Sequence, residues 1–160
     1  MENTMKMYVT ADEAAQILGV SRGYAYKIIR GLNNELKEKK VLFMDRVLIV
    51  EDDTDINNFI NDYFIIKGYS TVQSFSGTEG LLRLNTDKEI CCIILDLMLP
   101  GISGEEIIKN VRDVSDVPII AVSAKSGDDT KIEVLKLGAD DFLLKPFNLE
   151  ELQLKVDRKS

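Results

Sequence analysis

From residue 46 onward, the sequence alternates short apolar runs with segments in which apolar residues recur at helical spacing. The runs Val47–Val50 and Cys91–Leu95 are continuously apolar, which is typical of strands that are covered on both faces of a sheet. We predict strands at Val47–Val50, Tyr69–Phe75, Cys91–Leu95, Ile119–Val122 and Phe142–Leu144.

The segments between these strands have the spacing of amphipathic helices. In the first segment, Phe59, Phe64 and Ile66 belong to one apolar helical pattern, which ends at Gly68. We predict helices at Asp55–Lys67, Thr78–Leu84, Gly104–Val111 and Asp129–Leu137, and a last helix that begins with a capping box at Asn148 and Glu151. These repeats predict an α/β domain with a doubly wound parallel sheet between two layers of helices.

Ligands of doubly wound sheets bind outside the carboxyl ends of the strands. The polar residues that directly follow predicted strands are Glu51, Asp52, Asp96, Ser123 and Lys145. Because the carboxyl ends of parallel strands meet at one edge of the sheet, we expect these side chains to lie together.

Three of these side chains are carboxylates, which repel one another unless a cation lies among them. Oxygen ligands without Cys or His favour a hard ion such as Mg²⁺, and the chain contains no histidine. We therefore interpret Glu51 and Asp52 as metal ligands, and Asp96 as a residue that gives one oxygen to the metal and keeps the other as a nucleophile.

A phosphoryl group on Asp96 would need its charge neutralised by the metal on one side and by an ammonium group on the other. Lys145 is the candidate ammonium group. Ser123 offers a hydroxyl to a phosphoryl oxygen, and the small Ala124 leaves room for it.

Four blocks of sequence resemble, in the right order, the receiver domain of two-component response regulators: Val47–Asp53, Leu95–Gly101, Val122–Lys125 and Gly138–Phe147. The resemblance covers about residues 46–157 and implies a flavodoxin-like fold with five parallel strands in the order 2-1-3-4-5 and five helices.

The resemblance also implies a role for each site residue. Asp96 is the phosphoacceptor, and the ligands of Mg²⁺ are Glu51, Asp52, Asp96 and the backbone carbonyl of Met98. The phosphoryl-binding residues are Ser123, Ala124 and Lys145. The switch residues are Ser123 and Phe142, at positions where relatives often have threonine and tyrosine. The Lys145–Pro146 peptide bond is expected to be cis.

The function implied is that of a response regulator in a phosphorelay, which accepts a phosphoryl group from a histidine kinase. The protein is expected not to be an enzyme, apart from self-catalysed phosphoryl transfer to Asp96 and autodephosphorylation. Phosphorylation would change the face formed by the fourth helix, fifth strand and fifth helix, lead to a homodimer through that face and regulate transcription. The alternative is a stand-alone receiver that relays phosphate or docks to a protein without binding DNA. A phosphatase of related fold is disfavoured because Met98 stands where such enzymes place a second aspartate.

The first forty residues differ in charge from the remainder, with seven Lys or Arg against five Asp or Glu, whereas the other 120 residues have 13 against 22. We therefore divide the chain into a segment 1–40, a linker 41–45 and a receiver domain 46–160, the first of which is either native or fused. No apolar run approaches the roughly 18 residues of a membrane-spanning helix, so we expect no membrane contact and a cytoplasmic protein.

Residues 8–36 resemble the small helix-turn-helix of excisionase-like regulators, with a first helix after a capping box at Thr10 and a turn at Gly19 and Val20. An ordinary helical hairpin is the alternative. In the DNA-binding interpretation, the residues that face DNA are Ser21, Arg22, Tyr24, Lys27 and Arg30.

Overall fold

The structure is a computed structural model that describes residues 11–21, 23–25, 27–28, 31, 45–125 and 127–159. The chain divides into two compact units, Met1–Asp45 and Arg46–Ser160. Among the residues described, no helix is both long enough and apolar enough to cross a bilayer.

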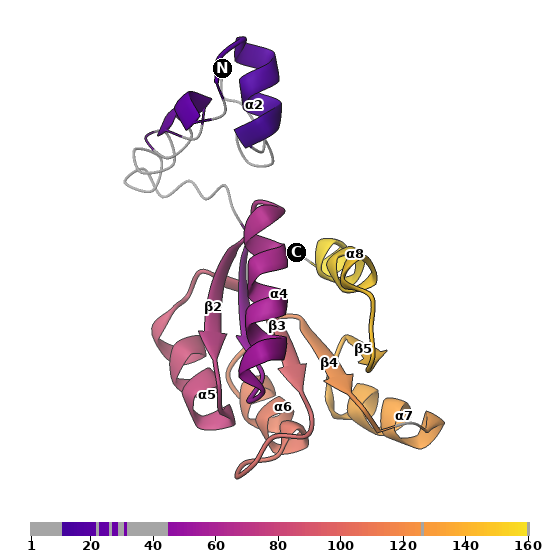
Figure 1. The fold of residues 1–160 in the computed structure, drawn as a ribbon. Coiled ribbons are helices and arrows are strands. Elements are labelled where there is room, and N and C mark those ends of the chain that lie inside the picture. The colour runs from indigo at the N-terminus through magenta and orange to yellow at the C-terminus, as the bar shows by residue number, and fades with distance from the viewer. Residues whose placement is uncertain are drawn as a thin grey trace. The chain divides into compact units, whose positions relative to one another are not determined.

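The second unit has a parallel sheet with helices on both faces (Figure 1). Its elements are β1 (Arg46–Val50), α4 (Thr54–Ile66), β2 (Ser70–Ser74), α5 (Gly77–Thr86), β3 (Ile90–Asp96), α6 (Gly104–Arg112), β4 (Ile119–Ser123), α7 (Asp128–Leu137), β5 (Asp141–Leu144) and α8 (Leu149–Lys159). The strand order is β2-β1-β3-β4-β5, which confirms the predicted order.

Two apolar clusters, one on each face of the sheet, fix the helices in place. On one face, Ile60 and Phe64 of α4 and Leu152 of α8 pack against Val47 and Ile49 of β1. On the other face, residues of α5, α6 and α7 pack against β1, β3 and β4. Because both faces of the central strands are buried, those strands have the continuous apolar runs from which they were predicted.

The side of α4 that packs on the sheet differs from the apolar pattern in its sequence. Asn57, Ile60 and Phe64 are buried, whereas Phe59 is 65% exposed and Ile66 is 74% exposed. The buried positions are spaced three and four residues apart, as expected for the single side of a helix that touches a sheet. The polar Asn57 therefore belongs to the core side, and two large apolar residues do not.

Short side chains cap the helices next to the sheet edge. Asp53 Oδ1 accepts hydrogen bonds from the backbone N–H groups of Asp55 (2.9 Å) and Ile56 (3.1 Å), so Asp53 begins α4. Asn148 caps α8, as predicted, by accepting from the N–H groups of Glu150 and Glu151. The predicted Lys145–Pro146 cis bond is also present.

The first unit contains the helix α2 (Ala11–Leu18), a turn at Gly19 with a φ of 66°, and helical residues after Ser21. Ser21 Oγ accepts from the N–H of Tyr24 at 3.3 Å, which is a helix cap. Ala25 is buried, while Tyr24 and Lys27 are exposed. Thr10, Arg22 and Arg30 lie outside the described residues.

Candidate functional site

Three carboxylates meet at the carboxyl ends of β1 and β3. One ligand atom each from Glu51, Asp52 and Asp96 lies within 4.8 Å of the other two. Glu51 and Asp96 are buried, and Asp52 is exposed, so the cluster opens to solvent on the Asp52 side. Because the donors are all carboxylate oxygens and one side is open, the set fits a hard divalent ion that keeps several waters, such as Mg²⁺.

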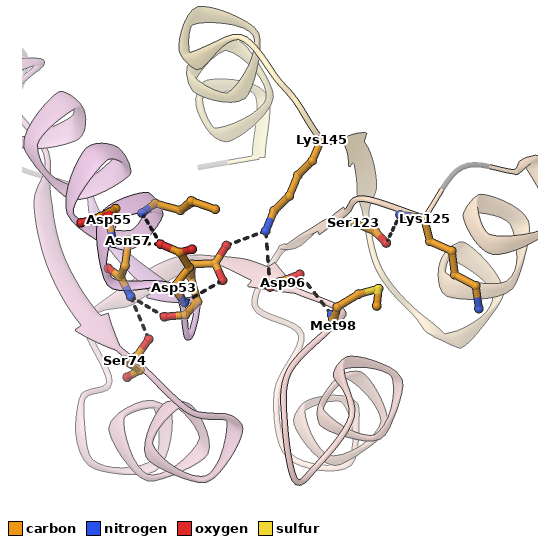
Figure 2. A network of polar contacts seen from close by, with 11 residues as sticks. Asp53, Asp55, Asn57, Ser74, Asp96, Met98, Ser123, Lys125 and Lys145 are labelled. Carbon is orange, nitrogen blue, oxygen red and sulfur yellow. Dashed lines mark hydrogen bonds and ion pairs between the residues drawn. The ribbon is translucent and has the colours of Figure 1, made fainter.

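Lys145 provides positive charge at this cluster from the end of β5. Its Nζ lies 2.6 Å from Glu51 Oε1 and 3.4 Å from Asp96 Oδ2, and Figure 2 shows the side chain reaching toward Asp96. The backbone N–H of Lys145 donates to the carbonyl of Ser123 at 2.8 Å. This bond continues the pairing of β5 with β4 and sets the direction from which the ammonium group enters the site.

The cluster has more negative charge than Lys145 can compensate. Burial raises the pKa of Glu51 to about 7, in spite of the hydrogen bond from Lys145, and the neighbouring Asp96 adds to the rise. Burial acts in the opposite direction on Lys145, but Glu51 and Asp96 together raise the pKa of its ammonium group above its ordinary value. A further cation is therefore the natural complement of these side chains.

The two oxygens of Asp96 have different neighbours. Oδ1 accepts from the backbone N–H of Met98 at 3.0 Å, while Oδ2 faces Lys145. The loop after Asp96 folds back closely, since a Cβ at Gly104 would lie 2.5 Å from the Cα of Leu97. Glycine at this position thus allows α6 to begin directly beside the backbone that follows Asp96. The use of the Met98 carbonyl as a metal ligand remains a prediction.

Ser123 and Ala124 lie at the end of β4, beside an open cavity of about 440 Å³. Ser123 is buried, and its Oγ accepts from the N–H of Lys125 at 3.0 Å. A hydroxyl that accepts in this way still has its own hydrogen to donate. The cavity is lined by Leu97, Met98, Glu105, Ser123, Ala124, Lys125 and Thr130.

Phe142 lies on β5 beside Ala121 of β4 and packs, half-buried, against the apolar cluster that includes α7. The preceding Asp141 accepts from Lys155 Nζ of α8 at 3.1 Å and from the N–H of Phe142 at 2.8 Å. Burial alone would raise the pKa of Asp141, but these two hydrogen bonds hold it below its ordinary value. The pair therefore ties α8 to β5 at neutral pH.

The structure brings together the predicted residues of the second unit, since Glu51, Asp52, Asp96, Ser123 and Lys145 all lie at one edge of the sheet. The sequence interpretation missed Asn57, whose side-chain amide donates to the carbonyl of Glu51 at 3.0 Å. Asn57 has the helical spacing of Ile60 and Phe64, but this spacing indicates a core position only once the packed side of α4 is known.

A family model for the response regulator receiver domain matches residues 47–157. The chain is 39% identical over 115 residues to the response regulator SaeR of Staphylococcus epidermidis, covering 71% of this chain and 49% of that protein. It is 38% identical over 109 residues to the transcriptional regulatory protein YcbL of Bacillus subtilis, covering 68% of this chain and 48% of that protein. The chain thus spans about half the length of these curated relatives.

Solved structures agree with the sequence matches. The receiver domain of a Francisella response regulator superposes with a TM-score of 0.69 at 36% identity, covering 71% of this chain and 94% of that domain. The response regulator TrrA of Thermotoga maritima, solved in complex with Mg²⁺ and BeF, superposes with a TM-score of 0.66 at 29% identity, covering 73% of this chain and 100% of that protein.

We predict that Asp141→Asn lowers the free energy of unfolding by about 1 kcal/mol at pH 7, because the hydrogen bonds to a charged acceptor are weakened. The pKa of Asp141 is lower in the folded protein than its ordinary value of 3.8. The carboxylate therefore makes its full contribution to the free energy of unfolding above about pH 5, and this contribution is lost as the pH falls below 3.8. Denaturant unfolding at pH 7 and pH 3 measures the difference. The exposed Asp116→Asn is the control, and an equal loss for Asp141→Asn at both pH values would contradict the prediction.

Proposed function

Because the chain belongs to the response regulator receiver domain family, we propose that Asp96 accepts a phosphoryl group from a phosphohistidine of a histidine kinase. The donor histidine has to come from a partner, since this chain has none. The proposal rests on the position of Asp96. Its buried carboxylate belongs to the carboxylate cluster and lies close to the ammonium group of Lys145.

In this proposal, a carboxylate oxygen of Asp96 attacks phosphorus, the P–N bond to histidine breaks, and an acyl phosphate forms on Asp96. A Mg²⁺ ion held by Glu51, Asp52 and Asp96 would supply positive charge to the transferring group. Lys145 would compensate charge from the β5 side, and Ser123 would donate its hydroxyl hydrogen to a phosphoryl oxygen. In autodephosphorylation, water would attack the phosphorus, the bond from phosphorus to the Asp96 oxygen would break, and inorganic phosphate would leave.

We expect wild-type protein to gain the mass of one phosphoryl group when it is incubated with phosphoramidate and Mg²⁺, and to gain nothing when EDTA replaces Mg²⁺. Asp96→Asn should remain unmodified, because an amide is not a nucleophile for this transfer. The matched control is Asp53→Asn, since Asp53 caps α4 and asparagine caps equally well. Intact mass spectrometry reads the result, and a phosphorylated Asp96→Asn protein would refute the assignment.

We further propose that phosphorylation acts on the face formed by α7, β5 and α8, through Ser123 and Phe142 on the adjacent strands β4 and β5. Ser123 would move toward the phosphoryl group and Phe142 would turn into the space that it leaves. Ile132 and Leu135, exposed apolar residues of α7, suit contact with a second copy.

We predict that beryllofluoride with Mg²⁺, the pair bound in the TrrA structure, shifts the wild-type protein from monomer to dimer in sedimentation velocity. Ile132→Asp should keep it monomeric, because a carboxylate would be buried at the contact. Phe59→Asp, at an exposed apolar site on α4, should dimerise like wild type. A wild type that stays monomeric, or an Ile132→Asp that dimerises, argues against this face.

The output of the switch is proposed to be transcription, and the protein is proposed to act in the cytoplasm. For DNA binding by the first unit, the favourable observation is the exposure of Ser21, Tyr24 and Lys27 around the start of a capped helix. Without such binding, the protein would be a stand-alone receiver that relays phosphate or docks to a protein.

We expect the full chain to bind a generic DNA duplex in a fluorescence anisotropy titration at low salt, with an affinity that falls as salt rises. Lys27→Glu should weaken binding, whereas the same charge reversal at the exposed Lys88 of the second unit should have little effect. Equal titration curves for Lys27→Glu and wild type, or no binding at low salt, would favour the stand-alone receiver.

A further inference from the structure

A buried side-chain amide, to which no role has been assigned above, holds the loop that carries the metal-ligand candidates Glu51 and Asp52. Glu51 and Asp52 lie in the short connection between Val50, the last residue of β1, and Thr54, the first residue of α4. Their charges repel each other and Asp96, so the connection tends to open unless its backbone is fixed.

Asn57, in the first turns of α4, supplies that fixation. Its side chain is fully buried, and its Nδ2 donates to the carbonyl of Glu51 at 3.0 Å and to the carbonyl of Ser74 at 2.9 Å. The N–H of Glu51 donates to the same Ser74 carbonyl at 3.1 Å. Both backbone polar groups of Glu51 are thus tied to the end of β2, and Figure 2 shows Asn57 between the loop and Ser74.

The orientation of the Asn57 amide is also determined. Two carbonyls face one end of it and require the NH₂ group there. At the other end, Gln73 Nε2 donates to Asn57 Oδ1 at 3.0 Å. Gln73 Nε2 also donates to Oδ1 of the exposed neighbour Asn58 at 2.8 Å, but among the residues that the structure describes no hydrogen bond joins the Asn58 side chain to the loop.

We propose that Asn57 is a positioning residue for the metal site, which holds Glu51 and Asp52 beside Asp96 before the ion binds, with Gln73 orienting its amide. This inference rests on the proposed function in that it takes Mg²⁺ as the ligand. It differs from that proposal in assigning part of the metal affinity to a residue that offers no ligand.

The test is the Kd for Mg²⁺, measured by isothermal titration calorimetry on the full chain, together with the thermal unfolding midpoint in EDTA. Asn57→Leu should raise the Kd about 10-fold or more, as is usual when a group that orients metal ligands is removed. Gln73→Leu should raise the Kd less, because Asn57 keeps its two bonds to the carbonyls and loses only the hydrogen bond that Gln73 donates to its Oδ1. Asp52→Asn, which alters a ligand directly, is the positive control.

Three variants separate positioning from general stability. Asn58→Leu makes the same change one residue away, and Ser74→Ala removes a buried hydroxyl that has no hydrogen-bond partner in the described structure while leaving the Ser74 carbonyl. Ile60→Val weakens the core contact of the same helix. All three should keep the wild-type Kd, even where the midpoint in EDTA falls.

Absence of Mg²⁺ binding in wild type would overturn the proposed metal site itself. Binding by wild type with an unchanged Kd in folded Asn57→Leu would overturn only the role of Asn57. If Asn57→Leu does not fold, Gln73→Leu decides, and a wild-type Kd in that variant would likewise overturn the inference.

Discussion

Repulsion among Glu51, Asp52 and Asp96 is the constraint that the rest of the domain has to satisfy. Their carboxylate oxygens lie within 4.8 Å of one another. Two unit charges about 4 Å apart interact by about 4 kcal/mol at an effective dielectric constant of about 20. Lys145 supplies one positive charge, so full ionisation of three carboxylates would leave two negative charges uncompensated. Burial is the main reason that the pKa of Glu51 is raised, and the neighbouring Asp96 adds to the rise. A divalent ion would supply the positive charge that opposes both effects.

The apolar sheet is what forces these groups together. Parallel pairing of β1 with β3 places Asp96 next to the residues after Val50, and pairing of β4 with β5 brings Ser123 beside Leu144, which precedes Lys145. Burial of apolar surface on both faces of the sheet offsets the electrostatic cost at its edge. The polar cluster is therefore positioned by strands whose buried apolar residues form the core, while their last residues, such as Asp96 of β3 and Ser123 of β4, carry the chemistry.

Much of this arrangement was predictable because strand and site leave adjacent signals in the sequence. The continuous apolar runs give β1 and β3, and the carboxylates follow them directly. The bond between Lys145 and Glu51 was not predicted, although both were expected at this edge of the sheet, since the sequence assigned Lys145 to the phosphoryl group on Asp96. The sequence also could not show which side of α4 packs on the sheet, because apolar residues cover more than one side of that helix. Asn57 resolves this ambiguity, since only the buried side offers carbonyls that satisfy its amide.

In the dimer proposed through the face formed by α7, β5 and α8, charged pairs and exposed apolar residues would contribute differently to affinity. Asp140, just before β5, and Lys155, on α8, each already have an ion-pair partner within the chain, Arg112 and Asp141 respectively.

The guanidinium group of Arg112 is held beside Asp140, because it also donates to the carbonyls of Gly138, Ser115 and Val117. Exchanging one partly exposed ion pair for another changes the free energy little, since such pairs contribute about 0 to 1 kcal/mol. Burial of the exposed Ile132 and Leu135 has no such offset, because these side chains give up only water. Affinity at this face would therefore come from α7, and the charged pairs would set the register of the two copies.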